Sequence, residues 1–183
     1  MNIPYKIAVL VYVFNDAGQL LLLHRKKLPN KDLYSPIGGK LEQGIGESPY
    51  QCALREIHEE IGIDLALENI RLMGIVSERG YASHAGTESH WLMFCFEVRR
   101  RLNFPSREFE EGRLEWINPG DVEKLDIPKT DREVIWPLVK RNSQMLDSNR
   151  GAVMEEAFFS VHIDCTDAEN FVVTQEHPRT NCE

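Results

Sequence analysis

The stretch L-R-E-I-H-E-E-I-G, residues 54 to 62, restricts the possible folds more than any other part of the chain. From residue 47 to residue 61 the apolar side chains recur at intervals of three and four, which is the spacing of an amphipathic helix. Ser48 and Pro49 suit the first turn of such a helix, and Gly62 suits its end. The pattern predicts a helix over 47–61 that packs one face against a core.

The same helix carries three acids, Glu56, Glu59 and Glu60, within five positions. We expect these carboxylates on one side of the helix, roughly opposite the apolar face that includes Ala53. Carboxylates at this spacing repel one another, and the one guanidinium of Arg55 cannot offset all three. Clustered oxygen ligands suit a hard divalent cation such as Mg²⁺, whose shell is completed by phosphate and water. The alternative is an acidic, solvated helix face.

A glycine-rich loop precedes the helix. Residues 27 to 46 contain two Pro and four Gly without sustained periodicity, which predicts a long loop with a short strand at 40–42. Gly38 and Gly39 permit a close approach of the backbone to a ligand. Their position just ahead of the acidic helix favours a metal site over a solvated face.

The stretch from Gly39 to Ile63, G-x7-E-x7-R-E-I-H-E-E-I-G-I, resembles the Nudix box, G-x5-E-x7-R-E-U-x-E-E-x-G-U, where U is aliphatic. All nine fixed positions are present, and the one departure is two additional residues between Gly39 and Glu47. A match of this length is far stronger than a lone glycine motif. Because the insertion lies in a loop, it can bulge outward without moving the three acids relative to one another.

This resemblance implies an α/β fold, an α/β/α sandwich around a central mixed sheet in which the box forms a loop, a helix and a second loop. It also implies hydrolysis of a nucleoside diphosphate linked to another moiety, by attack of water at phosphorus with Mg²⁺ or Mn²⁺. The order of expected strands and helices fits that fold from about residue 4 to 141. We therefore divide the chain into a hydrolase domain, 1–142, and a C-terminal extension, 143–183.

By the same resemblance, Glu56, Glu59 and Glu60 are the metal-binding and catalytic carboxylates, and the Gly38 carbonyl is a further metal ligand. Glu56 or a glutamate of a later loop positions or deprotonates the attacking water, since bound metal lowers the pKa of water. In that later loop Glu111 fits best as an additional metal ligand, because related members place a glutamate shortly before a Gly and a Trp.

The resemblance gives the remaining box residues a structural role: Glu47 and Arg55 tie the loop to the helix, and Gly39 and Gly62 bound the box. For phosphate contact the candidates are Arg25, at the end of the second expected strand, and Lys40, which follows the two glycines. A solvated strand end is an equally good interpretation of Arg25.

The segments 33–42 and 111–132 resemble the branch that hydrolyses nucleoside triphosphates, including 8-oxo-dGTP. Some members read the purine edge with an Asn three residues before the glycine pair and with an acid in the later loop. Ser35 and Asp131 occupy these places here, so we take both as substrate-binding candidates. A serine offers one hydroxyl instead of the paired donor and acceptor of an amide.

Other functions stay open. Tyr81 is compatible with a dinucleoside polyphosphate, because members with that activity tend to carry a Tyr about this far beyond the box. The branch that hydrolyses nucleotide sugars such as ADP-ribose often has a Pro in this region, and residues 50 to 104 contain none. A Nudix-like module that senses a nucleotide without cleaving it commonly lacks a box glutamate. All three are present here, so we favour an enzyme.

Outside the box, period-two patterns and turn residues predict strands, with a hairpin at the D-A-G turn, and two later segments predict helices. The expected strands are 5–14, 19–26, 70–78, 90–98 and 114–117, and the expected helices are P-G-D-V-E-K-L, 119–125, and T-D-R-E-V-I-W-P-L-V-K-R, 130–141. After Arg141 a linker is expected over 142–151, followed by a C-terminal hairpin over 157–166 and 171–175. That hairpin could pair with a sheet edge, cover the cleft or join two copies as a homodimer.

Charge and composition limit the partners. The net charge of −8 argues against a nucleic-acid polymer as partner and favours a small nucleotide that enters with a metal ion. The N-terminal apolar run ends at Asn15, too early to span a membrane. Cys52, Cys95, Cys165 and Cys182 lie far apart, without zinc-site spacing or a disulfide framework. We therefore expect a cytoplasmic protein with free thiols.

Overall fold

The computed structural model describes residues 3–27, 30–82, 88–146 and 157–178. The strands are β1 (Tyr5–Tyr12), β2 (Leu20–Arg25), β3 (Tyr34–Ser35), β4 (Ile70–Ala82), β5 (Glu88–Val98), β6 (Arg107–Phe109), β7 (Gly112–Ile117), β8 (Phe159–Asp164) and β9 (Val172–His177). The helices are α1 (Pro49–Ile61) and α2 (Trp136–Asn142), with 3₁₀ turns η1 (Gln43–Ile45), η2 (Leu67–Asn69) and η3 (Val122–Lys124) and a π-helical turn η4 (Asp131–Ile135).

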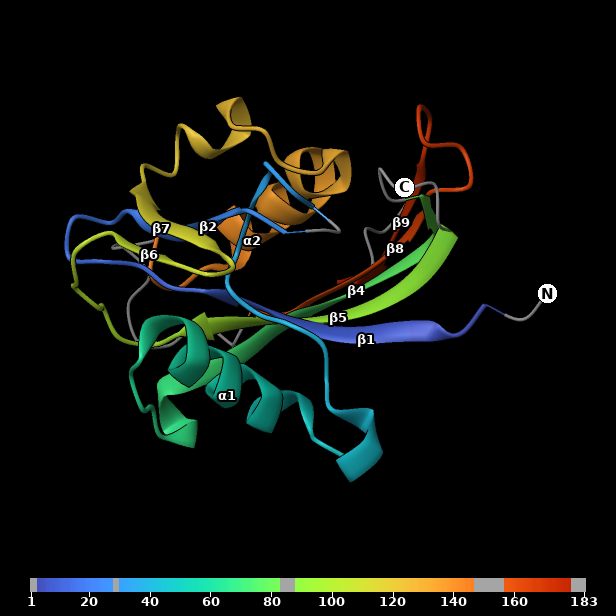
Figure 1. Ribbon diagram of the computed structural model, residues 1–183. Coiled ribbons are helices and arrows are strands. Elements are labelled where there is room, and N and C mark those ends of the chain that lie inside the picture. The colour runs from blue at the N-terminus through green and yellow to red at the C-terminus, as the bar shows by residue number, and fades with distance from the viewer. Residues whose placement is uncertain (1–2, 28–29, 83–87, 147–156, 179–183) are drawn as a thin grey trace.

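The strands form two sheets between the two helices. A five-stranded sheet has the order β1-β5-β4-β8-β9, and a four-stranded sheet has the order β3-β2-β7-β6. In the larger sheet β1 runs parallel to β5 and β8 runs parallel to β4, while the other pairs are antiparallel. Helix α1 covers one side and α2 the other (Figure 1). The predicted α/β/α arrangement, its mixed sheet and the C-terminal hairpin β8–β9 are confirmed.

Strands β1 and β2 are buried on both faces, because each face meets a different helix. In β1, Val9 and Val11 pack in the cluster with α1, whereas Tyr12 packs in the cluster with α2. In β2, Leu21 and Leu22 divide in the same way. These strands therefore read as continuous apolar runs instead of alternating ones.

The hairpin predicted for the first two strands forms only at its turn. The Leu21 N–H donates to the Val13 carbonyl at 2.9 Å, and Phe14 bridges Leu20. Beyond that point β1 pairs with β5 and β2 pairs with β7, so the two strands diverge into different sheets. Long-range strand pairing determines which sheet each strand joins, and the local turn residues carry no information about it.

Three shorter predictions are corrected by the structure. The strand expected at 40–42 is reduced to one bridge between Lys40 and Ala8. The helix expected over 119–125 is the single turn η3. The helix expected over 130–141 is divided into η4 and α2, because Pro137 has no N–H to continue an α-helical ladder and suits a first turn.

The start of the expected linker packs against the core. Ser143 is fully buried, and Met145 and Leu146 pack against the cluster that contains α2. The division of the chain at residue 142 stays a prediction. Cys52, Cys95 and Cys165 are buried free thiols, and Cys182 lies outside the described residues. In the described part of the chain, no helix is long and apolar enough to cross a membrane.

A buried ion pair fixes this segment to the sheet. Arg71 on β4 donates to Glu97 on β5 at 2.8 Å, and both side chains are almost fully buried. The guanidinium also donates to the carbonyls of Asn142 and Ala157, while Glu97 accepts from the Ser143 hydroxyl. Residues on both sides of the 147–156 segment are therefore held by one charge pair.

Replacing Arg71 by Met would leave Glu97 buried without its counter-charge. We expect the Arg71→Met variant to lose about 3–5 kcal/mol of unfolding free energy, measured by urea denaturation. The control is Arg79→Met on the same strand, which removes the exposed pair between Arg79 and Asp164 and should leave the free energy of unfolding nearly unchanged. Equal losses in the two variants would contradict the role assigned to burial.

Candidate active site

Helix α1 has defined ends that set the direction of its acids. The Ser48 hydroxyl accepts from the Gln51 N–H, and the Gln51 side chain accepts from the Ser48 N–H, which forms a capping box. Gly62 ends the helix in the left-handed conformation, with φ of 80°. The observed helix begins two residues later than the predicted one.

The prediction that the acids lie opposite the apolar face is wrong for Glu56 and Glu60 and holds only for Glu59. Glu56 is 9% exposed and Glu60 is 4% exposed, whereas Glu59 lies on the surface. At 100° per residue, positions 56 and 60 lie next to Ala53 on the helix, on the side that faces the protein. The two carboxylates are therefore buried between α1 and the glycine loop instead of forming a solvated patch.

Three backbone hydrogen bonds hold the glycine loop against β1, one of them from the Leu41 N–H to the Ile7 carbonyl at 3.0 Å. The N–H groups of Val9 and Val11 donate to the carbonyls of Gly39 and Ile37 at 2.9 and 2.8 Å. Gly38 has a φ of 137°, and a Cβ there would lie 2.2 Å from the Val9 carbonyl oxygen. Only glycine can occupy this position without displacing the loop.

Gly39 is required for a different reason. A Cβ at this position would lie 2.2 Å from Oε1 of Glu56 and 2.6 Å from its carboxyl carbon. The missing side chain therefore makes the space that the Glu56 carboxylate fills. The two glycines act together: one brings the loop to β1, and the other brings it to the acid.

Arg55 connects the loop to the helix. Its Nε and Nη2 donate to the two oxygens of Glu47 at 2.8 and 3.0 Å, and Nη2 also donates to the Lys40 carbonyl at 3.2 Å. Nη1 donates to Glu56 at 2.7 Å and to Glu59 at 3.1 Å. The guanidinium thus contacts three acids at once. Its hydrogen bonding to Glu47 keeps the pKa of that carboxyl group below the usual range.

The two-residue insertion projects away from this network. A Cβ at Gly44 or Gly46 would meet nothing within 4 Å, and Ile45 is 76% exposed. Glu47 nevertheless reaches Arg55, so the added residues leave the contact between loop and helix intact.

Burial controls the charge state of the acids. Desolvation raises the pKa of Glu60 to about 8, with further contributions from Glu56 and Glu111, while Arg25 opposes the shift. Desolvation also raises the pKa of Glu56, against the effect of Arg55. One oxygen of Glu60 is buried without a hydrogen-bond partner. Burial therefore shifts both acids toward their protonated forms.

These acids border a cleft of about 430 Å³ on the α2 side of the larger sheet. Most of the substrate and metal candidates named from the sequence line it: Arg25, Ser35, Gly38, Gly39, Lys40, Glu56, Glu59, Glu111 and Asp131. Glu60 is not among the residues that line the cleft, but it is close enough to Glu56 and Glu111 for their charges to raise its pKa. Glu47, Arg55 and Gly62 do not line the cleft.

The floor of the cleft contains residues that the sequence did not single out. The strand register places Lys6, Trp91 and Glu78 side by side across β1, β5 and β4. Lys6 and Lys40 both lie over the Trp91 ring, with Nζ atoms 5.2 and 5.9 Å from its centroid. The available signal was that Glu78 shares the inward-facing side of its strand with Val76, which is buried two residues earlier.

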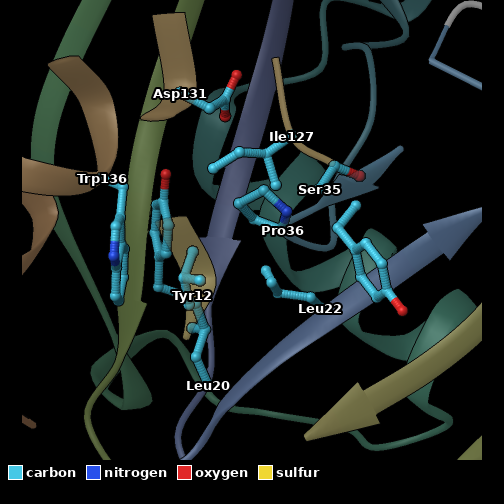
Figure 2. A pocket seen from close by; sticks show the side chains of 10 residues that line it. Tyr12, Leu20, Leu22, Ser35, Pro36, Ile127, Asp131 and Trp136 are labelled. Atoms are coloured by element: carbon cyan, nitrogen blue, oxygen red, sulfur yellow. The ribbon is translucent and has the colours of Figure 1, made fainter. Parts of the chain in front are cut away.

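A small cavity of about 20 Å³ adjoins the cleft and shares Ser35, Pro36 and Asp131 with it. In Figure 2 Tyr12 stands beside Trp136, with its phenol oxygen toward Asp131. The Ser35 hydroxyl and the Trp136 Nε1 are buried without a hydrogen-bond partner among the described residues. The volume is enough for about one water molecule.

The donor set fits a hard divalent cation. It consists of oxygens from Glu56, Glu59, Glu60 and Glu111 and includes a buried carboxylate oxygen without a partner. Among the described residues no three acidic, histidine or cysteine side chains are already spaced as a closed ligand set. Arg55 occupies one oxygen each of Glu56 and Glu59, so a cation would compete with this guanidinium.

The side chain of Tyr81, on which the dinucleoside polyphosphate alternative depends, lies outside the described residues.

Comparison with known proteins identifies a domain family. The NUDIX domain model matches residues 4–136. An RNA pyrophosphohydrolase of Gluconobacter oxydans is 42% identical over 143 residues, which cover 67% of this chain and 76% of that protein. A Bacillus subtilis protein with the provisional name 8-oxo-dGTP diphosphatase is 28% identical over 130 residues, covering 71% and 78% of the two chains.

Solved structures show the same fold. The MutT protein of Bacillus halodurans superposes with a TM-score of 0.65 at 22% sequence identity. The superposition covers 96% of this chain and 99% of that chain, so the similarity continues beyond the part that the domain model matches.

Gly39→Ala tests whether the glycine makes room for Glu56. The new Cβ would displace the carboxylate, and we expect a loss of catalytic turnover of roughly 100-fold or more with the fold intact by circular dichroism. Gly44→Ala is the matched control, because a Cβ there meets nothing, and it should retain normal turnover. Normal turnover in Gly39→Ala would refute the close packing of loop and acid.

The stability of the fold should depend on pH through Glu78. Burial raises the pKa of Glu78 from 4.5 to about 7, so between these values the folded state holds a proton that the unfolded state has lost. The free energy of unfolding must then fall as pH rises through this window. Relative to the parent, Glu78→Gln should gain up to about 3 kcal/mol between about pH 5 and pH 8. Denaturation curves across this range measure the gain, and the exposed Glu133→Gln should run parallel to the parent.

Proposed function

The chain belongs to the NUDIX domain family and is a hydrolase of acid anhydrides, and on this premise we propose that it converts a nucleoside triphosphate to a monophosphate and pyrophosphate. One observation carries the proposal: acids of the box and the cationic side chains of Lys6, Arg25 and Lys40 share a single cleft. The acids suit a metal ion that accompanies phosphates, and the cationic side chains suit the phosphates themselves.

Arg25 and Lys40 bind the phosphate chain in this proposal. Both line the cleft, and the Nε of Arg25 is buried without a hydrogen-bond partner among the described residues. A guanidinium with a free donor matches the oxygens of a phosphate. Lys40 follows the glycine pair directly and adds a second positive charge on the same side as Glu56.

The Gly38 carbonyl, Glu56, Glu59, Glu60 and Glu111 would hold Mg²⁺ or Mn²⁺. When bound, such an ion neutralises charge that develops on the phosphates and lowers the pKa of coordinated water. The supporting observations are the unpartnered oxygen of Glu60 and its raised pKa, to which burial contributes most and the charges of Glu56 and Glu111 add.

We assign the proton transfer to Glu56. The Arg55 guanidinium donates to its carboxylate at 2.7 Å, and the carboxylate also packs against Gly39. It therefore meets an attacking water in one orientation. A carboxylate held near the phosphorus accepts the proton that the water loses. Glu111, from the loop between β6 and β7, is the alternative base.

Ser35 and Asp131 are the candidates for contact with the base, because both line the cleft and the small cavity beside it. The 8-oxo-dGTP named for one relative and the RNA named for another make both compounds members of the substrate panel. Dinucleoside polyphosphates and nucleotide sugars remain alternative substrates, and nucleotide sensing without cleavage remains the alternative function.

We further propose a cytoplasmic enzyme without a membrane or nucleic-acid polymer as partner, in keeping with the net charge of −8. A homodimer through the C-terminal hairpin is part of the same proposal, since β9 forms the free edge of its sheet.

The test is release of pyrophosphate or phosphate from a nucleotide panel with and without Mg²⁺. Glu59→Gln and Glu60→Gln should lower turnover by roughly 10²- to 10⁴-fold, because each removes a negatively charged ligand. Glu68→Gln, an exposed acid outside the cleft, is the control and should retain normal turnover. A lack of turnover with every compound, together with measurable binding, would support the sensing alternative instead.

A further inference from the structure

We infer that Glu78 and Asp131 form a recognition pair that binds the N–H donor edge of a 2-amino-4-oxopyrimidine ring, the ring that guanine and pterins share. The inference rests on the proposed function, because it names the substrate class of the same cleft. It adds Glu78, a residue on β4 that the Nudix box does not include.

Glu78 is an acid without an adequate partner. Its side chain is 4% exposed, it lines the cleft, and its Oε1 has no hydrogen-bond partner among the described residues. The Thr130 side chain lies within hydrogen-bonding reach of the carboxyl group. A buried carboxyl oxygen left unpaired costs free energy, which a ligand donor would recover.

Asp131 lines the same cleft and is close enough for the charge of Glu78 to affect it. It is the first residue of the π-helical turn η4, and such turns often occur at functional sites. Burial and the charge of Glu78 raise the pKa of Asp131 to about 7. Within the described residues neither carboxyl group forms an ion pair with a lysine or arginine.

The floor of the cleft next to Glu78 carries an aromatic side chain, Trp91. Trp91 lies between Lys6 and Glu78 in the strand register, so a ring placed on this part of the sheet would contact an aromatic floor. Lys6 and Lys40 lie over Trp91, and in the strand register Lys6 and Glu78 lie on opposite sides of it. The cleft therefore has cationic and acidic side chains on different strands. A nucleotide has the same polarity, with phosphates at one end and ring donors at the other.

The chemistry of the pair selects the ring edge. Both carboxyl groups line the same cleft, and if the pair held one proton it would present one O–H donor beside carboxylate acceptors. A 2-amino-4-oxopyrimidine edge presents a carbonyl acceptor beside a ring N–H and an amino group. The two patterns are complementary, whereas a ring without the amino group leaves an acceptor unpaired.

The C-terminal hairpin maintains this arrangement. Strand β8 pairs with β4 and places Ile163 opposite Glu78, so Glu78 lies on an inner strand and not at a sheet edge. Lys129 donates to the Glu169 carbonyl at 2.6 Å and lies over the Phe171 ring at 5.3 Å, which fixes the segment that carries Thr130 and Asp131. Both acids therefore depend on residues beyond the matched domain, 4–136.

The first measurement is binding in EDTA, so that it does not depend on catalysis. GMP and IMP, which differ by the 2-amino group, are titrated into the full chain by calorimetry. We expect GMP to bind roughly 10- to 100-fold more tightly than IMP. Neopterin carries the same edge on a pteridine, and its affinity relative to GMP identifies the preferred scaffold.

The second measurement repeats these titrations with Glu78→Gln, which replaces an acceptor by a donor. We expect the GMP-to-IMP ratio to fall to within about threefold of unity, mainly through weaker GMP binding. Glu133→Gln, an exposed acid on η4, is the matched control and should keep the parental ratio. If Glu78→Gln does not fold, Glu78→Asp keeps the charge, shortens its reach and should give an intermediate ratio.

A folded Glu78 variant with the parental GMP-to-IMP ratio would overturn the inference. So would a parent chain that binds GMP and neopterin no more tightly than IMP. A parent that discriminates in EDTA but hydrolyses none of the nucleotides with Mg²⁺ would refute the proposed function and leave the recognition pair standing.

Discussion

The site depends on the contact between the glycine loop and strand β1. Three backbone hydrogen bonds hold the loop so closely that neither Gly38 nor Gly39 has room for a Cβ. The loop in turn closes over the Glu56 carboxylate, and Arg55 joins both to Glu47. Any change in this spacing moves the acids of α1 relative to the cleft. The close approach is therefore the constraint on which the metal candidates and the phosphate candidates both depend.

Burial gives the cleft two acidic regions with different properties. At α1, Glu56 and Glu60 are accompanied by Arg55 and Arg25, and their clustered carboxyl oxygens suit a cation that would favour the ionised forms. At the far wall, Glu78 and Asp131 have no cationic partner among the described residues, and desolvation keeps a proton available to them near neutral pH. The first region suits a metal and the second suits neutral donors, because each needs different chemistry to compensate its charge.

The chain beyond the matched domain is integrated with the catalytic part. The buried pair of Arg71 and Glu97 holds residues on both sides of the 147–156 segment, and β8 extends the sheet next to β4. Removing β8 would turn β4 into an edge strand and expose Glu78 to water. The family resemblance covers neither β8 nor this effect, although the fold similarity to the Bacillus halodurans protein extends over 96% of the chain.

The sequence by itself determined the family, the fold class, helix α1 and several of the residues that line the cleft, because the Nudix box has fixed spacing and local periodicity encodes the helix. It did not determine that Glu56 and Glu60 are buried, nor that β1 and β2 separate into two sheets. It also did not single out Glu78. These properties depend on which strands pair and what covers each face, and residues distant in sequence decide both. Only the tertiary structure could turn one inward glutamate on β4 into a candidate for substrate recognition.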